Sequence, residues 1–227
     1  MVGSLLFAIA SSIGIIISGF WLIFFLFEDR KNPEPPFLIT KTFLLGMLAA
    51  GFAVCIEHLL SFRFFGLVGI ANYSFPALLS NSFVEEIMKF LVVLLFIRRS
   101  RFLDEPIDLM IYMITAALGF AAVENLFFFN SVRSIEELIG LASLRFVGAT
   151  LMHALASGIL GYLWAKRRLI FGLLLVSLLH AVFNYLILKL GPTIFPTILL
   201  VVMAIAMFAD FDKLKEYYER RKFRKSL

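Results

Sequence analysis

The stretch FVEEIMKFLVVLLF, residues 83 to 96, holds three ionisable side chains inside a long apolar run. They are Glu85, Glu86 and Lys89, and the lysine follows the two acids by four and three residues, so a helix brings all three to one side. A charged side chain at the centre of a bilayer costs roughly 2.5–3.5 kcal/mol on insertion scales. Chance is a poor explanation for three of them, and we interpret the group as functional.

Polar residues recur at helical spacing in this apolar segment and in the three that follow it. In chain order, the further members are Asn81, Ser82, Glu124, Asn125, Thr150, His153, Ser157, Ser177, His180 and Asn184. Steps of three and four residues place the members of one segment on one helix face. We expect the four faces to meet in a shared polar site.

The two adjacent acids suit acid and base catalysis. Neighbouring residues on a helix point about 100° apart, so Glu85 and Glu86 cannot easily reach one ligand together, but one can act while Lys89 holds the other. Close acids at low dielectric also favour unlike protonation states. The pair therefore offers a candidate general base and a candidate proton donor.

The histidines allow a metal centre. His153 and His180, with a carboxylate from a third helix, could complete a three-ligand Zn²⁺ site with an open position for water, and Glu124 is the carboxylate that we assign to it. A metal-free scheme uses the same groups: a glutamate activates water, and His180 with Asn184 donates hydrogen bonds to the oxyanion. The sequence contains no HExxH motif and leaves both schemes open.

Composition indicates what must position these residues. Hydrophobic residues make up 61% of the chain and charged residues 16%, with a mean hydropathy of +0.95, which lies outside the usage of soluble domains. The basic residues form short clusters rather than a continuous patch, so we do not expect nucleic-acid binding. Cys55 is the single cysteine, which excludes an internal disulfide and a multi-cysteine metal cluster.

A helix needs about 20 apolar residues to cross a bilayer, and seven segments reach or approach that length. We place them at residues 4–27, 43–60, 75–97, 107–130, 143–165, 169–190 and 193–211. The sequence predicts an all-α polytopic membrane protein, a single domain over residues 1–227, with a polar site between its third and sixth helices. Small residues four apart in the fifth segment, Ser157, Gly161 and Ala165, indicate close helix packing.

The loop charges predict the orientation of the chain in the plasma membrane. Of its 21 Lys and Arg residues, 16 follow the odd-numbered segments and four follow the even-numbered ones. We therefore expect the amino terminus outside and the basic tail, residues 212–227, in the cytoplasm against membrane lipid. Glu124 and Asn184 then lie outward of their helix centres, so the site should open toward the outer half of the bilayer. Glu57 and His58 should be interfacial.

Four stretches in this order resemble the PrsW family of intramembrane proteases, itself similar to the wider group of CAAX prenyl endopeptidases and bacterial ABI proteins. They are FVEEIMKF, DLMIYMITAALGFAAVENLFFF, LRFVGATLMHALASGILGYLWAKRR and LLHAVFNYL, within a match from about residue 33 to about residue 188. The resemblance implies Glu85 and Glu86 as paired catalytic glutamates followed by the basic Lys89. Its other motif positions are Glu124, Asn125, His153, His180 and Asn184.

Asp108 and Arg145 also match positions common in the family, and they are equally well explained as charges at helix ends. The resemblance implies peptide-bond hydrolysis in a membrane-associated protein, for which we expect a single-span substrate. The best-known members make the first cut in an anti-sigma factor, and an outward-opening site suits such a cut.

Two other classes fit part of the pattern. A non-catalytic membrane scaffold or regulator would keep the fold, although the presence of both glutamates, Glu124 and both histidines argues against it. A proton-coupled transporter also uses intramembrane Glu, Lys and His residues. It predicts broken helices and an internal repeat, and the sequence indicates neither.

Overall fold

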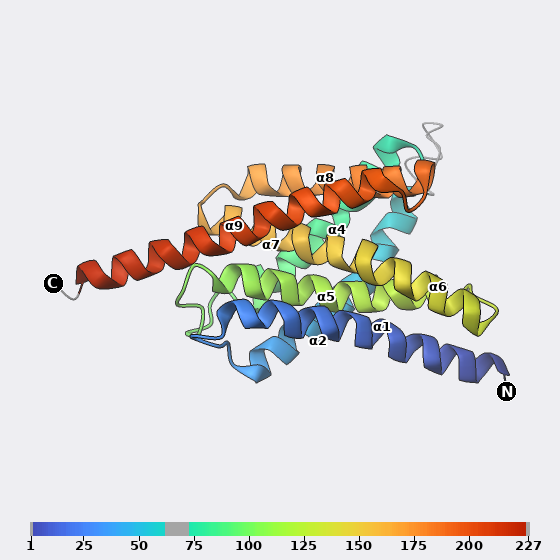
Figure 1. Ribbon diagram of the computed structural model, residues 1–227, viewed down its shortest axis with the longest axis horizontal. Coiled ribbons are helices and arrows are strands. Elements are labelled where there is room, and N and C mark those ends of the chain that lie inside the picture. The colour runs from blue at the N-terminus through green and yellow to red at the C-terminus, as the bar shows by residue number, and fades with distance from the viewer. Residues whose placement is uncertain (1, 62–72, 226–227) are drawn as a thin grey trace.

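The computed structural model describes residues 2–61 and 73–225, and within them the chain is a bundle of helices without strands (Figure 1). The α-helices are α1 (Val2–Leu26), α2 (Pro36–Leu59), α4 (Phe75–Phe96), α5 (Asp108–Phe129), α6 (Ile135–Arg145), α7 (Leu151–Ala165), α8 (Leu169–Leu190) and α9 (Ile194–Lys225). A 3₁₀ turn, η1 (Phe27–Asp29), follows α1, and a π-helical segment, η3 (Phe146–Thr150), joins α6 to α7. The all-α prediction is confirmed.

Among the described residues, six helical stretches are long and apolar enough to cross a membrane. They are Ala8–Asp29, Pro36–Leu59, Asp108–Phe129, Ile135–Ala165, Leu169–Leu190 and Ile194–Tyr218. The remaining predicted segment, 75–97, corresponds to α4. Its 22 residues are also long enough to cross. Every 18-residue stretch of α4 contains the three charged residues Glu85, Glu86 and Lys89, however, so α4 is not apolar enough to count among the six. The chain is an integral membrane protein, and the seventh crossing stays a prediction.

Three predicted boundaries were wrong. The second helix begins at Pro36, seven residues early, because proline suits the first helical turn. The fifth begins at Ile135 rather than 143. Ser134 Oγ accepts from the Glu137 N–H at 3.1 Å and the Glu137 carboxylate accepts from the Arg133 N–H at 2.8 Å, so the acids of this turn cap a helix.

The last helix does not end at residue 211 either. It continues through the predicted tail as far as Lys225, and residues 226–227 lie outside the described part of the chain. The basic tail is therefore a helical extension of the last membrane segment.

Helix α5 lies at the centre of the bundle and packs against α1, α2 and α7. Glycines let these helices come into backbone contact: a Cβ at Gly119 would lie 2.0 Å from the Phe43 carbonyl oxygen, and one at Gly46 would lie 2.1 Å from that of Ala116. A Cβ at Gly161 would lie 2.6 Å from Met110 Cα, which confirms the close packing predicted for the fifth segment. Such contacts fix the positions of α5 and α7 along the bundle, and with them the positions of the side chains that these helices direct into the site.

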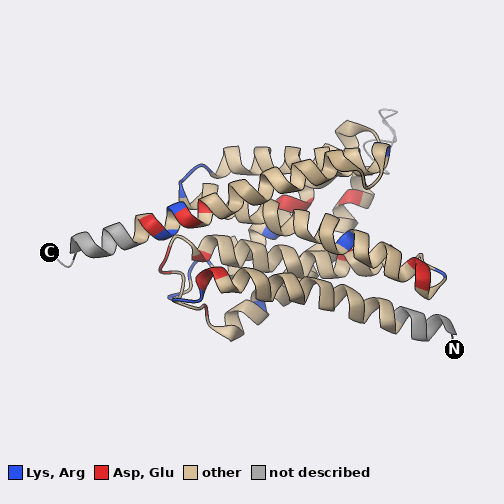
Figure 2. Ribbon diagram, viewed as in Figure 1, with Lys and Arg blue, Asp and Glu red and all other residues tan. Residues whose placement is uncertain are grey.

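The two ends of the chain lie at opposite ends of the bundle (Figure 1). Figure 2 shows that charged residues gather where η1, the α4–α5 connection, the α7–α8 turn and α9 meet. We call this the η1 end of the bundle. A smaller group of charges lies inside the bundle, and it forms the site described next.

Candidate active site

Glu86 is the acid that Lys89 holds. Lys89 Nζ donates to Glu86 Oε1 at 2.8 Å, and His180 Nδ1 lies 2.9 Å from the same oxygen. Ser157 Oγ donates more weakly to Glu86 Oε2, at 3.5 Å. All four side chains are buried. Glu86 is thus enclosed by donors from α4, α7 and α8, and it is the less available of the two acids.

Glu85 is placed differently. Its Oε2 atom is buried and has no hydrogen-bond partner among the described residues. Around that atom lie Lys89 Nζ at 3.6 Å, His180 Nε2 at 3.8 Å and His153 Nδ1 at 3.9 Å. An unpaired buried carboxylate oxygen carries the full desolvation cost of a charge. This atom therefore lies where a proton, a metal ion or a water molecule would be bound.

The contacts of the two histidines determine where their ring protons lie. An ammonium only donates, so His153 Nδ1, 2.7 Å from Lys89 Nζ, accepts. The other ring nitrogen, Nε2, donates to Glu124 Oε2 at 2.6 Å. His180 Nδ1 likewise donates to the carboxylate of Glu86, and its Nε2 lies 3.8 Å from Glu85 Oε2. The two ring nitrogens nearest Glu85 are thus His180 Nε2, which has no hydrogen bond to the described residues, and His153 Nδ1, which is engaged by Lys89.

Arg145 is the residue that sequence reasoning left undecided. Its Nη2 donates to Glu124 Oε2 at 2.9 Å and its Nε donates to Asn125 Oδ1 at 2.5 Å, while the side chain is only 8% exposed. Asn125 Nδ2 in turn donates to Thr150 Oγ1 at 3.0 Å. Arg145 is thus both the last residue of α6 and a buried partner of Glu124 and Asn125, which favours a functional role over that of a helix-end charge alone.

The segment η3 explains why the pattern did not reveal Arg145. Arg145 and Thr150 are five residues apart, which on a regular α-helix is about 140° apart around the axis. In a π-helical turn, residues five apart are hydrogen-bonded neighbours. The π segment therefore turns Arg145 onto the face that carries Thr150 and His153. The opening of a helix by one residue beside a functional group is a recurrent feature of π-bulges.

Several predicted members of the polar faces lie near this group without joining its hydrogen bonds. Asn184 is half-buried one turn beyond His180 and makes no hydrogen bond to the described residues. Asn81 Oδ1, Ser82 Oγ and Ser177 Oγ are buried without a partner in the same part of the chain. Unsatisfied polar atoms of this kind mark space for water or a ligand.

Glu57 was expected to be interfacial together with His58. His58 is exposed, but Glu57 Oε1 is buried without a described partner and lies within electrostatic range of Glu124 and Lys89. Glu57 therefore faces the site from α2. No periodic pattern predicts this position, because Glu57 is the only ionisable residue on its helix face.

Asp108 belongs to a different part of the molecule. It lies at the first turn of α5, and its Oδ2 accepts from the backbone N–H groups of Asp104 and Glu105 at 2.9 and 2.7 Å. It therefore holds the α4–α5 connection at the η1 end of the bundle and does not contact the site between α4 and α8.

The donors at the centre of the site fit a catalytic metal ion. Glu85, His153 and His180 each offer one ligand atom, and these atoms lie within 4.8 Å of one another. Two imidazoles with one carboxylate are a known catalytic Zn²⁺ set. The second ring nitrogens of the histidines contact Glu124 and Glu86, as those of metal-binding histidines usually do. The assignment of Glu124 as a ligand stays a prediction, and the geometry favours Glu85 in that role.

Fold and site together define a helical membrane protein with a buried cluster of acids and imidazoles, and comparison with known proteins assigns its family. The sequence profile of the PrsW family intramembrane metalloprotease matches residues 34–209. The chain belongs to this family, and the resemblance stated from the four motifs is confirmed. It is a membrane-embedded peptidase by homology.

Three curated relatives show the extent of the likeness. Protease PrsW of Clostridioides difficile (strain 630) is 27% identical over 223 residues, which cover 92% of this chain and 90% of that protein. Protease PrsW of Geobacillus kaustophilus (strain HTA426) is 30% identical over 176 residues, 74% of each chain. Protease PrsW of Bacillus subtilis (strain 168) is 26% identical over 184 residues, 77% of this chain and 80% of that one. No solved structure matches.

Proposed function

We propose that this protein is an endopeptidase that hydrolyses a peptide bond of a membrane-associated protein near the outer side of the bilayer. The observation that carries the proposal is Glu85 Oε2, a buried carboxylate oxygen without a hydrogen-bond partner, within 4 Å of ring nitrogens of both His153 and His180. Structural polar networks satisfy their buried atoms. A site that leaves its most costly atom unsatisfied is built to receive a reactant.

The two acids of α4 take different roles. Glu86 anchors Lys89 and His180, so it fixes the geometry of both. In the metal-free scheme Glu85 binds a water molecule and takes its proton, which is the general-base step of amide hydrolysis. Glu124 fixes the tautomer of His153 and is itself held by Arg145.

A bound Zn²⁺ ion would be held by Glu85, His153 and His180, and it would lower the pKa of its bound water to about 7. The contact between His180 Nδ1 and Glu86 favours this scheme over one in which His180 donates to an oxyanion, because a ring N–H of His180 is already used in that contact. Lys89 contacts His153 Nδ1, and a metal ion competes with this ammonium for the same nitrogen.

The proposed orientation rests on charge. Removing the buried Arg145 from the loop count leaves 16 basic residues on one side against three on the other. Termini at opposite ends of the bundle require an odd number of crossings, which supports α4 as a seventh one. The amino terminus is then outside and α9 ends in the cytoplasm. A single-span protein resembling an anti-sigma factor is the substrate class that we propose.

The test is a proteolysis assay in which purified protein and a panel of single-span membrane proteins are reconstituted in liposomes. We expect Glu85→Gln and Glu86→Gln to lower cleavage of the best substrate by at least about 10²-fold, with unchanged membrane insertion. Glu136→Gln, at an exposed acid in the first turn of α6, is the matched control and should cleave normally. Wild-type cleavage by both α4 variants would overturn the proposal, as would a wild-type protein that cleaves nothing in the panel and serves only as a scaffold.

A further inference from the structure

A second group of acids lies at the η1 end of the bundle, away from the site between α4 and α8. Asp29 comes from η1, Glu34 from the connection to α2 and Asp108 from the first turn of α5. One carboxylate oxygen from each lies within 4.8 Å of the others, and the residues are only 5%, 8% and 1% exposed. Three buried acids in contact repel one another, so something must compensate their charge.

Two of these acids are anchored by protein donors. The Tyr112 hydroxyl donates to Glu34 Oε2, and the backbone N–H groups of Asp104 and Glu105 donate to Asp108 Oδ2. Anchoring fixes the direction in which each carboxylate points. The remaining oxygens of the group are thus held in place toward one another before any ligand arrives.

Asp29 is the exception. The residue is only 5% exposed, and its buried Oδ2 atom has no hydrogen-bond partner among the described residues. The nearby ammonium of Lys215 pairs with Glu28 at 2.5 Å rather than with Asp29. Asp29 thus leaves one oxygen unpaired while the residue lies beside two other buried carboxylates, as an acid does that is placed to bind a cation.

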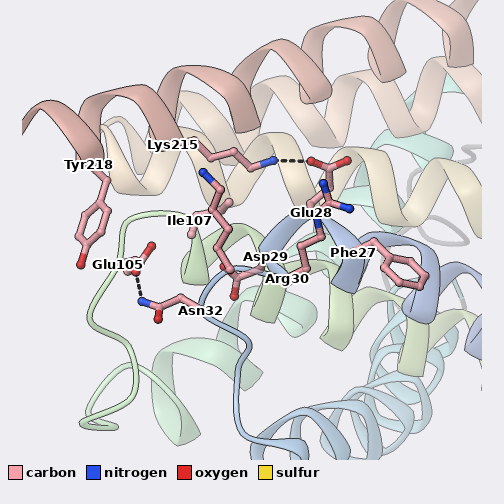
Figure 3. Close-up of a pocket in the computed structure, with 10 residues that line it drawn as sticks. Phe27, Glu28, Asp29, Arg30, Asn32, Glu105, Ile107, Lys215 and Tyr218 are labelled. Carbon is pink, nitrogen blue, oxygen red and sulfur yellow. Dashed lines mark hydrogen bonds and ion pairs between the residues drawn. The ribbon is translucent and has the colours of Figure 1, made fainter.

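A solvent-accessible pocket lies beside Asp29. A pocket of about 590 Å³ opens beside η1 and α9, and Asp29 forms part of its wall together with Asn32, Glu105, Lys215 and Tyr218 (Figure 3). Figure 3 shows Lys215 directed to Glu28 and Asn32 directed to Glu105. The donor groups of Lys215 and Asn32 are therefore already paired with other acids of the pocket wall. A small ion and its water molecules can therefore approach Asp29 from the η1 end.

We propose that Asp29, Glu34 and Asp108 form a second metal site, which binds a hard divalent cation of the Ca²⁺ or Mg²⁺ type. All three donors are carboxylate oxygens, which such cations prefer, and the group contains no imidazole or thiolate that would select Zn²⁺. Water molecules from the pocket would complete the coordination, since Ca²⁺ takes six to eight oxygen ligands. The ion joins η1 to the first turn of α5.

This inference is independent of the proposed proteolysis. In the proposed orientation the ion would come from the cytoplasm, on the opposite side from the outward-opening active site. Its structural effect is to fix the turn between α1 and α2 against the central helix α5. The inference thus predicts a stabilising cation with no ligand in common with the Glu85, His153 and His180 group.

Calcium binding to the purified full-length protein in detergent tests the site. After chelator treatment and dialysis, we expect ⁴⁵Ca²⁺ to bind saturably at one ion per chain, with Mg²⁺ or Mn²⁺ as competitors. Saturating Ca²⁺ should raise the Tm of the chelated protein by about 5 °C, because the ion binds the folded state alone. Glu85→Gln, at the other site, should retain both effects.

Asp29→Asn is the decisive variant. It should abolish Ca²⁺ binding and the Ca²⁺-induced rise in Tm. In chelator its Tm should equal or exceed that of the wild type, because the substitution removes a repelling charge, and this result shows that the variant folds. Glu136→Gln, an exposed acid on α6, is the matched control and should bind normally. The proposal is overturned if the wild type shows no saturable binding at millimolar Ca²⁺, or if Asp29→Asn binds as tightly as the wild type.

Discussion

Lys89 Nζ lies 2.7 Å from His153 Nδ1, inside the membrane-embedded core of the protein. The same ammonium lies 2.8 Å from Glu86 Oε1, 3.6 Å from Glu85 Oε2 and 4.6 Å from the centre of the Phe120 ring. It is a single cation surrounded by the donors that a metal ion would use. Lys89 and Zn²⁺ therefore compete for His153, and the competition makes the two catalytic schemes experimentally distinct.

The first prediction concerns metal content. If Zn²⁺ acts here, chelation should abolish cleavage and added Zn²⁺ should restore it. Lys89→Met should then bind Zn²⁺ at least about tenfold more tightly in equilibrium binding measurements, because an ammonium about 4 Å away repels the ion with about 4 kcal/mol per unit of its charge at an effective dielectric of 20. Lys189→Met, at an exposed lysine on α8, is the matched control.

The opposite result is equally clear. A zinc-free preparation that still cleaves at the wild-type rate contradicts the metal scheme. In that case Glu85 acts on water directly, and Lys89→Met should lower cleavage without any change in Zn²⁺ affinity.

The second prediction concerns the stability of the buried pair between Lys89 and Glu86. Both side chains are fully buried, and removal of one partner of such a pair costs about 3–5 kcal/mol because the other charge is left uncompensated. Lys89→Met should therefore lower the free energy of unfolding in detergent by that amount. The double variant Glu86→Gln with Lys89→Met should recover most of the loss. Additive losses in this double-mutant cycle would show that the two groups are not coupled.

The third prediction concerns Arg145. Its guanidinium bridges Glu124 and Asn125, and Glu124 contacts His153. Lysine keeps the charge but cannot reach both partners. We expect Arg145→Lys to lower kcat by about 10–100-fold, the usual range for residues that orient a metal-binding or catalytic histidine, while KM changes little.

Arg133→Lys is the control for that experiment, because Arg133 is exposed just before α6. If Arg145 were only a structural contact, Arg145→Lys would lower the Tm and leave kcat of the folded protein unchanged. A normal kcat would therefore contradict the role assigned to it.

The site residues could be identified from the sequence because they recur at regular helical spacing. Glu85, Glu86 and Lys89 follow α-helical spacing in α4, and the structure brings them to His153 and His180 as the stripes predicted. Arg145 was left undecided because the π-helical η3 breaks that spacing. The position of Glu57 beside the site had no such signal, because a lone acid near a helix end has no period, and the burial of its Oε1 atom depends on how α2 packs against its neighbours.

The helix boundaries show the same limit. Hydropathy located the apolar centres of the segments, but it missed the first turn of α6, where Glu136 and Glu137 lie, since acids at a helix start lower the mean hydropathy while they stabilise the turn. The metal set could not be derived either, because which of Glu85 and Glu124 faces both histidines depends on the rotation of α4 relative to α5. Sequence spacing carries no information about that rotation.

The last prediction concerns the backbone contact between α5 and α2. A Cβ at Gly119 of α5 would lie 2.0 Å from the Phe43 carbonyl oxygen, a backbone atom of α2 that cannot move aside. Gly119→Ala should therefore push the two helices apart and lower the free energy of unfolding by about 1–3 kcal/mol, as overpacking does. It should also reduce cleavage, because α5 carries Glu124 and Asn125 five and six residues further along.

Gly51→Ala is the matched control, because a Cβ at Gly51 of α2 would meet no atom within 4 Å. There the substitution removes only backbone flexibility, so it should leave cleavage unchanged and stabilise the helix by up to about 1 kcal/mol. Thermal unfolding of both variants in the same detergent, followed by the liposome assay, measures the difference. Equal stability of the two variants would show that close contact between α2 and α5 does not hold the site together.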